Sequence, residues 1–345
     1  TERAIESYRQ FLSDYPDRPE VARTKIALAR ILLDEEDPDS ALEALEGFSA
    51  ERVESSRRRS ELEYEAATLR VQSLLRSGRP EEALAAVEQA DAAAGNDGDR
   101  RKAILLRGRA LLALGRIDEG RQVLGDLVSS ASLQPEATTA RRISIEHFSR
   151  VEGPESDLLR EEIRAVRDAG RMAGSDVQVV RDHVALLDAY DRLKGRYDAQ
   201  DSTSAAAAFA LGEMVFTRYH RPAEARDWYV TSYELDPAGP LAPRTMYAIG
   251  WLSVEELDDS EFGEEWFQQI EICCPDSPQA RALRGEEFAE AKPRTREEIE
   301  RMIGLGPGAA ADGTRPVDLS DPRTVPWRAL RRGGPGAMTP REVGG

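Results

Sequence analysis

The sequence predicts an all-α protein built as a solenoid of repeated helical hairpins. Its 345 residues are rich in Ala and Leu, and only 6% are aromatic, a composition that favours helix over sheet. One pattern of small and bulky residues recurs along the chain at nearly regular spacing, which is typical of repeat architectures. Turns rich in Gly, Pro and Asp separate the copies, as expected where helices end.

The clearest copy of the repeat is residues 4–16, with alanine first, tyrosine at +4, phenylalanine at +7 and proline at +12. The same offsets return in residues 225–237, with a serine at +7, and in residues 263–275. A small residue lets two helices approach closely, the next two positions form one apolar stripe, and proline ends the helix. Each copy is therefore predicted to be the second helix of a hairpin.

Weaker copies keep the stripe without the proline and begin at Ala41, Ala83, Gly120 and Leu159. From Ala4 to Leu159 successive copies lie 37 to 42 residues apart. The first helices that should precede the stripes are residues 19–33, 57–77, 100–114, 136–149, 203–219 and 241–256. The stripe at Ala4 has no such helix before it, so we expect an N-terminally truncated array that continues upstream of Thr1.

The spacing fails once, because 66 residues separate Leu159 from Ala225. This irregular insertion, at about residues 170–200, is predicted to hold an extra helix from Asp176 to Asp198 that divides the array into two lobes. Residues 277–291 are expected to form a last helix that covers the end of the solenoid. The solenoid thus spans residues 1–291, and residues 292–345 are predicted to be a short helix followed by a disordered Pro/Gly-rich tail.

The chain is acidic, with a formal net charge of −17 and a pI near 4.9. Such a field disfavours nucleic acid and anionic lipid as partners and favours a basic protein or peptide. Residues 292–345 hold 10 basic and 7 acidic side chains, so the tail could contact the solenoid through opposite charge. No run of 18 apolar residues is present, so no transmembrane segment is expected.

Residues 11–22, Phe-Leu-Ser-Asp-Tyr-Pro-Asp-Arg-Pro-Glu-Val-Ala, resemble bacterial tetratricopeptide repeats. They are similar to repeats of the outer-membrane barrel-assembly lipoprotein and of the periplasmic Tol-Pal coordinator. The resemblance implies a right-handed α-solenoid whose first helices line a concave groove for a peptide or a partner's helix. It brings no catalytic residue, and it favours a periplasmic or outer-membrane-associated place over a cytoplasmic one. Four lysines beside 43 arginines also indicate a GC-rich, bacterial genome.

We find no pattern of residues that predicts catalysis, a cofactor or a metal. The three histidines, His147, His183 and His220, form no His-x-x-x-His pair, which a zinc site on a helix would need. The glycines of residues 304–308 follow no strand and precede no Lys-Ser/Thr, so they are read as linker and not as a phosphate loop. The adjacent Cys273 and Cys274 cannot close an ordinary structural loop, and packing at a helix edge explains them better than a redox or metal role.

Partner-binding residues are sought on exposed faces of the first helices. Helix phase selects four of them, namely Arg107, Arg142, Met214 and Tyr247. In the tail, Trp327 is flanked by Leu330 and arginines, so it is either a docking motif or a chance residue. The arginine runs 57–59, 100–101 and 141–142 are either solvated faces or grips for an acidic peptide.

These observations predict a non-catalytic scaffold or adaptor in a bacterial multiprotein assembly, an envelope assembly among the candidates. The alternative is an accessory or regulatory domain of a larger enzyme or sensor whose other module lies upstream. A free-standing enzyme is the third alternative, and it ranks last because no catalytic constellation was found.

Overall fold

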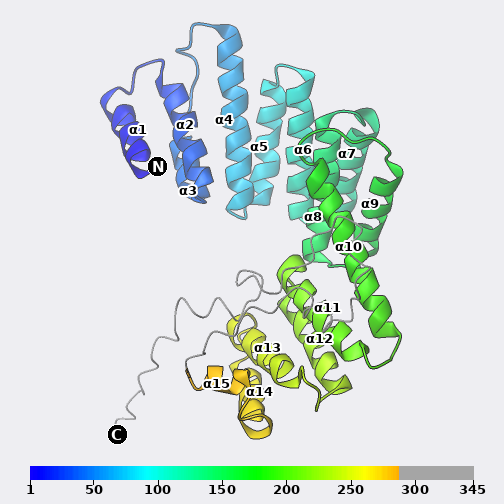
Figure 1. The fold of residues 1–345 in the computed structure, drawn as a ribbon. Helices are drawn as coiled ribbons and strands as arrows, with labels where there is room; N and C mark the ends of the chain where they lie inside the picture. The colour runs from blue at the N-terminus through cyan, green and yellow to red at the C-terminus, as the bar shows by residue number, and fades with distance from the viewer. Residues whose placement is uncertain (287–345) are drawn as a thin grey trace, which may run out of the picture. The chain divides into compact units, whose positions relative to one another are not determined.

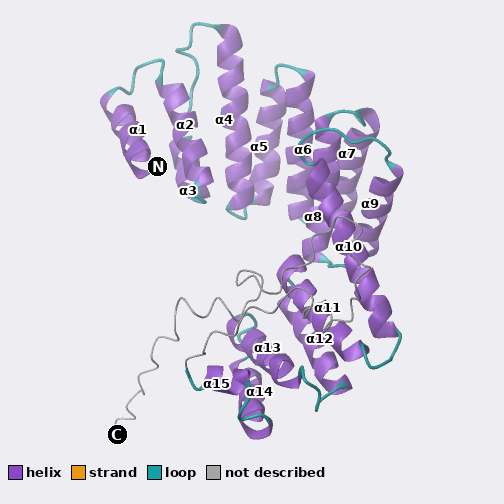
Figure 2. Cartoon of the chain, viewed as in Figure 1, coloured by secondary structure: helices purple, strands orange, loops and turns teal. Residues whose placement is uncertain are grey.

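A computed structural model describes residues 1–286 of the chain, and these residues form helices and loops without a strand (Figures 1 and 2). The all-α prediction is confirmed. The helices of the described part are α1 (Glu2–Asp14), α2 (Val21–Asp34), α3 (Pro38–Ala44), α4 (Ser56–Arg76), α5 (Pro80–Ala93), α6 (Asp97–Ala113), α7 (Ile117–Ser130), α8 (Pro135–Val151), α9 (Asp157–Asp168), α10 (Val177–Asp198), α11 (Ser204–Tyr219), α12 (Pro222–Leu235), α13 (Ala242–Glu255), α14 (Ser260–Cys273) and α15 (Pro278–Leu283).

The helices follow one another as hairpins. The first helices are α2, α4, α6, α8, α11 and α13, and their second helices are α3, α5, α7, α9, α12 and α14. Helix α1 carries the first stripe and packs against α2. The fold is therefore an α-solenoid of repeated hairpins, with α10 as an additional helix between α9 and α11.

The tight turns within hairpins have a common cause. Gly115 ends α6 with a left-handed φ of +74°, a conformation that glycine adopts at little cost. The N–H of Arg116 then donates to Leu111 O at 2.9 Å, and that of Gly115 donates to Leu112 O at 3.0 Å. These two bonds satisfy carbonyls that the helix end leaves free. Gly78 ends α4 in the same way, and Pro80 opens α5 at a position where its missing N–H costs nothing.

The described residues divide into two compact units. Of the described residues, the first unit holds 1–148 and 157–182, and the second holds 149–156 and 183–286. The division falls within α10, in the segment that the sequence analysis expected to interrupt the array. Val180 and Leu187 of α10 are buried.

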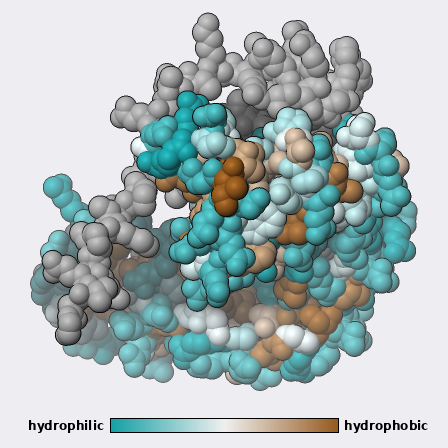
Figure 3. Space-filling model, turned by 90° about the horizontal axis from the view of Figure 1, so that it is seen from below, coloured by the Kyte–Doolittle hydropathy of each residue, from teal (hydrophilic) through white to brown (hydrophobic). Residues whose placement is uncertain are grey.

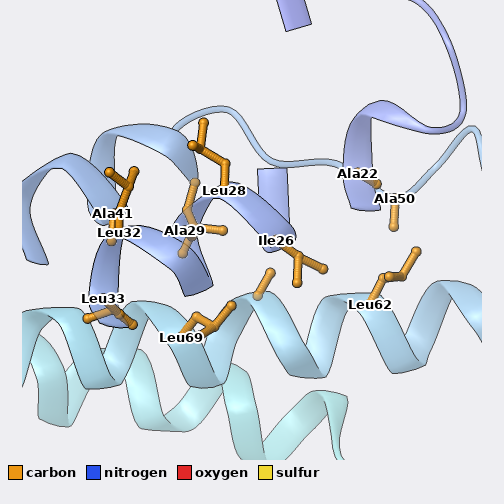
Figure 4. Close-up of a cluster of buried hydrophobic side chains, with 12 residues drawn as sticks. Ala22, Ile26, Leu28, Ala29, Leu32, Leu33, Ala41, Ala50, Leu62 and Leu69 are labelled. Atoms are coloured by element: carbon orange, nitrogen blue, oxygen red, sulfur yellow. The ribbon is translucent and has the colours of Figure 1, made fainter. Parts of the chain in front are cut away.

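The core of the first unit is made of aliphatic side chains from successive hairpins. Ile26, Leu32 and Leu69 belong to one cluster that joins α2, α3 and α4 (Figure 4). A second cluster joins α4, α5 and α6. Because each hairpin buries its apolar side chains against its neighbours, the array is stabilised by contacts along its length.

The core of the second unit is more aromatic. Tyr229 of α12 packs on Phe209 of α11 with 5.1 Å between ring centroids, and Tyr233 meets Trp266 of α14 at 5.0 Å in an edge-to-face arrangement. Aromatic pairs in such geometry stabilise a fold beyond the area they bury. Tyr190 of α10 is fully buried and donates a hydrogen bond to Glu155 Oε1 at 2.9 Å.

One predicted boundary is wrong. The last helix was expected to run to Ala291, but α15 ends at Leu283. Gly285 has a φ of +70°, and its N–H donates to Ala282 O at 3.1 Å, so the chain turns where glycine permits it. The predicted short helix and tail of residues 292–345, with Trp327, lie outside the described residues.

Candidate functional site

Within each unit the first helices lie close to one another. Helix α4 contacts both α2 and α6, and in the second unit Arg244 of α13 forms an ion pair with Glu213 of α11. The same helices pack on second helices with another part of their surface. The part of the first helices that does not pack on second helices forms a surface that runs from one first helix to the next. We call it the first-helix face and define it by Arg76, Arg109 and Arg142 in the first unit and by Glu213, Arg244 and Trp251 in the second.

Glycines mark the side of the first helices that meets the second helices. A Cβ built on Gly108 would lie 2.5 Å from a Leu124 side-chain atom of α7, and one on Gly250 would lie 2.5 Å from a Phe267 ring atom of α14. The next residue along an α-helix points about 100° away. It therefore leaves the hairpin interior and joins the first-helix face. The residues that follow the crossing glycines of α6, α11 and α13 are Arg109, Glu213 and Trp251.

Arg142 of α8 is one of the predicted partner-binding residues, and its guanidinium is held within the chain. Its Nη1 donates to Glu146 Oε1 at 2.8 Å and Oε2 at 2.7 Å, while its Nε lies 3.1 Å from Asp176 Oδ2. Thr139 Oγ1 donates to the same Asp176 oxygen at 2.7 Å. Burial alone would raise the pKa of Asp176, but the bonds from Thr139 and Arg142 lower it. Asp176 is therefore a carboxylate that orients Arg142.

Arg109 of α6 lies near Arg142, Glu146 and Asp176. Unlike Arg142, it is not held by other side chains. Among residues 1–286 it makes no hydrogen bond or ion pair. Burial lowers the pKa of Arg109, and the cationic Arg142 and Arg76 lower it further, whereas Glu146 and Asp176 raise it. Arg76 stands at the end of α4 and donates to Leu33 O. Arg109 thus lies among two other arginines and the carboxylates of Glu146 and Asp176, a group that we call the arginine cluster.

The structure does not bring Arg107 into this cluster. Residues two apart on an α-helix point about 200° apart, so Arg107 and Arg109 lie on different sides of α6. Arg107 is half-buried. The sequence analysis chose the right helix, but the crossing at Gly108 selects Arg109 as the residue on the first-helix face.

On the second unit, an ion pair links two first helices. The Arg244 guanidinium pairs with Glu213 and lies 4.6 Å from the centroid of the Phe209 ring, a favourable cation–π distance. Burial raises the pKa of Glu213, and Arg244 opposes this rise. The pair therefore holds α11 and α13 in register while its carboxyl carries a cost for being ionised.

The two predicted residues of this unit lie beside that pair in sequence. Met214 follows Glu213 and is half-buried. Tyr247 packs against Phe267 with 5.7 Å between ring centroids and belongs to the apolar cluster of the last hairpin. Burial raises the pKa of its phenol, and the negative charge of Glu255 raises it further. Part of the Tyr247 ring is thus already used in packing.

Trp251 of α13 is partly exposed and, as the residue after Gly250, lies on the first-helix face. Its ring meets Phe216 of α11 edge-to-face, with centroids 5.7 Å apart. Its indole Nε1 is buried and has no hydrogen-bond partner. A buried donor without a partner lowers stability.

The sequence analysis missed Arg76, Arg109, Glu213 and Arg244. One signal was present, since Arg76, Arg109 and Arg142 stand 33 residues apart. This interval is shorter than the spacing of the stripes, so the three arginines occupy different levels of their helices. Their proximity depends on how the helices pack, which no local pattern reveals.

Little metal or thiol chemistry is available in the described residues. Among residues 1–286 no group of three or more His, Cys, Asp or Glu side chains could hold a metal ion. Cys274 packs on the last apolar cluster and Cys273 is exposed. Burial, together with the neighbouring Cys274 thiol, raises the pKa of Cys273 to about 11, so Cys273 is a protonated thiol at neutral pH.

None of the helices in residues 1–286 has the length and apolar character needed to cross a membrane.

Comparison with known proteins gives one match to a protein family. Residues 26–98, which contain most of α2 and all of α3, α4 and α5, match the tetratricopeptide repeat family. No curated protein matches the chain. A solved structure described as the functional characterization of Pseudomonas aeruginosa pilF is similar over 78% of this chain and 98% of that chain, at 14% identity and a TM-score of 0.31.

Proposed function

We propose that this chain is a non-catalytic scaffold that binds a partner protein on its first-helix faces, within a bacterial multiprotein assembly. The observation that carries the proposal is the repeated hairpin itself, with a tetratricopeptide match over residues 26–98. Tetratricopeptide repeats generally mediate protein–protein interactions. An envelope assembly is the specific setting that we favour, on the resemblance of residues 11–22.

The side chains on these faces fit such a role. On the side of the protein that Figure 3 shows, separate hydrophobic patches lie among hydrophilic residues. Arg109 and Trp251 are large side chains that stay partly exposed, and Arg and Trp are among the residue types that most often dominate binding energy. The net charge of −17 would steer a basic partner towards the chain.

The test is capture of partners from a bacterial lysate, followed by alanine substitution on both faces. The face variants are Arg142→Ala, Met214→Ala and Tyr247→Ala, to which the structure adds Arg109→Ala and Trp251→Ala. Arg107→Ala is measured beside them, because helix phase selected that residue. Gln122→Ala and Gln268→Ala are matched controls, because both residues are exposed on second helices. Loss of a partner in face variants alone supports the proposal. Retention of the same partner by all five face variants contradicts it.

Salt dependence is a second measurement on any partner that is captured. Association steered by the net charge slows as salt rises, because the screening length falls to about 8 Å at physiological ionic strength. An association rate that is unchanged by salt would show that the partner is not selected by the acidic field.

A further inference from the structure

The two thiols of the chain lie side by side at the end of α14. Cys273 is the last residue of that helix and Cys274 is its C-cap. Their Sγ atoms are 2.7 Å apart and share a hydrogen bond in which either thiol can donate. Packing explains Cys274, which contacts the apolar cluster of the last hairpin, but it does not explain Cys273, which is exposed. These two side chains, which we call the thiol pair, are therefore open to a ligand on one side.

The turn that carries the thiol pair is held from two directions. The N–H of Cys274 donates to Ile270 O at 2.9 Å, which ties the turn to α14. From α15, Arg284 donates to Pro275 O at 3.0 Å and to Glu271 Oε2 at 2.8 Å. Both thiols thus start from a fixed backbone. A ligand that binds them together removes little further conformational freedom from the chain, and such preorganisation increases affinity.

Two common roles of paired thiols do not fit this pair. A structural disulfide joins Cα atoms roughly 4.4–6.8 Å apart, whereas the Cα atoms of adjacent residues are only about 3.8 Å apart. A zinc ion takes at least three protein ligands, and among residues 1–286 no group of three or more His, Cys, Asp or Glu side chains could hold a metal ion. The ligand that fits is one that needs two thiols and no third protein group.

We propose that the thiol pair is a binding site for a trivalent arsenical of the form R–As=O, in which one arsenic atom bridges the two sulfur atoms. Sulfur is a soft ligand, and trivalent arsenic bonds to two sulfurs while it keeps its substituent R. Both S–H bonds break, two As–S bonds form, and the oxygen leaves with the two protons as water. Arsenic stays trivalent, so no oxidant or reductant is needed. The site does not depend on the proposed function.

The geometry of the thiol pair favours arsenic over a soft metal ion. An ion such as Cu(I) that is bound by two thiolates alone is linear, with the sulfurs on opposite sides of the metal. Trivalent arsenic is pyramidal, with bond angles near a right angle, and accepts both sulfurs on one side. The Sγ atoms of Cys273 and Cys274 already lie together. Because Cys273 is exposed, its sulfur can move outward to admit the arsenic atom while Cys274 keeps its packing.

The experiment uses the full, reduced chain and phenylarsine oxide at neutral pH. Because the chain holds two cysteines, one bound arsenical should remove both free thiols in a thiol assay. Mass spectrometry should show one phenylarsenic group per chain, with the loss of one water. An excess of a monothiol should leave the adduct in place, whereas a small dithiol should release it. Two arsenicals per chain, or release by the monothiol, would overturn the proposal.

Two variants test whether both sulfurs are needed. Cys273→Ser changes an exposed side chain, so it should keep the fold and weaken binding by about tenfold or more, because the second As–S bond is lost. Cys274→Ala removes the other sulfur and should weaken binding by a similar factor. Circular dichroism checks that each variant is helical. If Cys273→Ser is folded and binds phenylarsine oxide as tightly as the parent chain, the bridge between the two sulfurs is refuted.

A comparison with an unfolded reference tests whether the fold prepares the site. A synthetic peptide of residues 268–279 contains the same two thiols without the packing of the last hairpin. The full chain should bind phenylarsine oxide about tenfold or more tightly than this peptide. The melting temperature of the chain should rise on binding, because a ligand that prefers the folded state stabilises it. Equal affinities of chain and peptide, or a fall in the melting temperature, would contradict a site that is built by the fold.

Discussion

Replacing Gly263 by alanine is expected to destabilise the last hairpin, because α13 and α14 cross there with no room for a side chain. A Cβ on Gly263 would lie 2.8 Å from the carbonyl oxygen of Gly250, 2.6 Å from Val254 Cγ2 and 3.3 Å from Ser253 Cβ. The valine methyl group can turn away. The carbonyl belongs to the backbone of α13 and cannot, so the two helices have to separate.

The magnitude follows from two opposing effects. Alanine stabilises a helix interior by about 1 kcal/mol relative to glycine, whereas an added methyl group in a packed crossing costs about 1–3 kcal/mol. Gly195 of α10 is the matched control, since it lies in the same unit and a Cβ there would have no neighbour within 4 Å. Both variants gain the helix preference. Their difference of about 1–3 kcal/mol in the free energy of unfolding therefore measures the crossing alone.

Urea unfolding followed by tryptophan fluorescence is the assay. Trp228, Trp251 and Trp266 are the tryptophans of residues 1–286, and all lie in the second unit, so the signal reports the unit that is changed. Midpoint and slope should be analysed separately, because repeat arrays depart from two-state unfolding. The larger Gly263→Leu should cost at least as much as the alanine. If Gly263→Ala is as stable as Gly195→Ala, the close approach of the two helices is refuted.

Three further predictions concern packing, capping and pH. Leu124→Ala removes a side chain that is 1% exposed and should destabilise the first unit by about 2–5 kcal/mol; a loss below 1 kcal/mol in thermal unfolding would contradict its place in the core. Asn96→Ala removes the side-chain cap of α6, which accepts from the Asp99 N–H at 3.0 Å, and should cost about 1 kcal/mol; Asn96→Asp is the control that keeps the acceptor. Burial raises the pKa of Glu213 in the folded protein, against the pull of Arg244. The folded state then binds more protons than the unfolded state between the ordinary and the raised pKa, so stability falls as pH rises through that window. Glu213→Gln should remove this fall in a pH series of melting temperatures, and an unchanged pH profile would show that Glu213 is not buried as described.

The sequence determined the class of the fold because the signals that start, orient and end a helix lie within the helix itself and its adjoining turns. Residues 4–16 and their copies specify where a helix lies, which side is apolar and where the helix ends. Gly78 and Gly115 can likewise be identified as turns from local sequence, because a residue in the left-handed conformation ends a helix whatever surrounds it. The repetition of these signals then requires neighbouring hairpins to pack, as a single hairpin cannot bury its stripe.

Only the tertiary structure decided which residues form the candidate site. Whether Arg107 or Arg109 reaches the first-helix face depends on the crossing of α6 over α7 at Gly108. Whether Arg142 is free or held depends on Asp176, which is distant in sequence and precedes α10. Helix phase accumulates error over a repeat. At Gly108, in contrast, an added Cβ would lie 2.5 Å from a Leu124 side-chain atom, so the close packing at that glycine fixes the rotation of the helix. Side-chain position on a solenoid surface is therefore set by helix packing, which the pattern of residues alone does not encode.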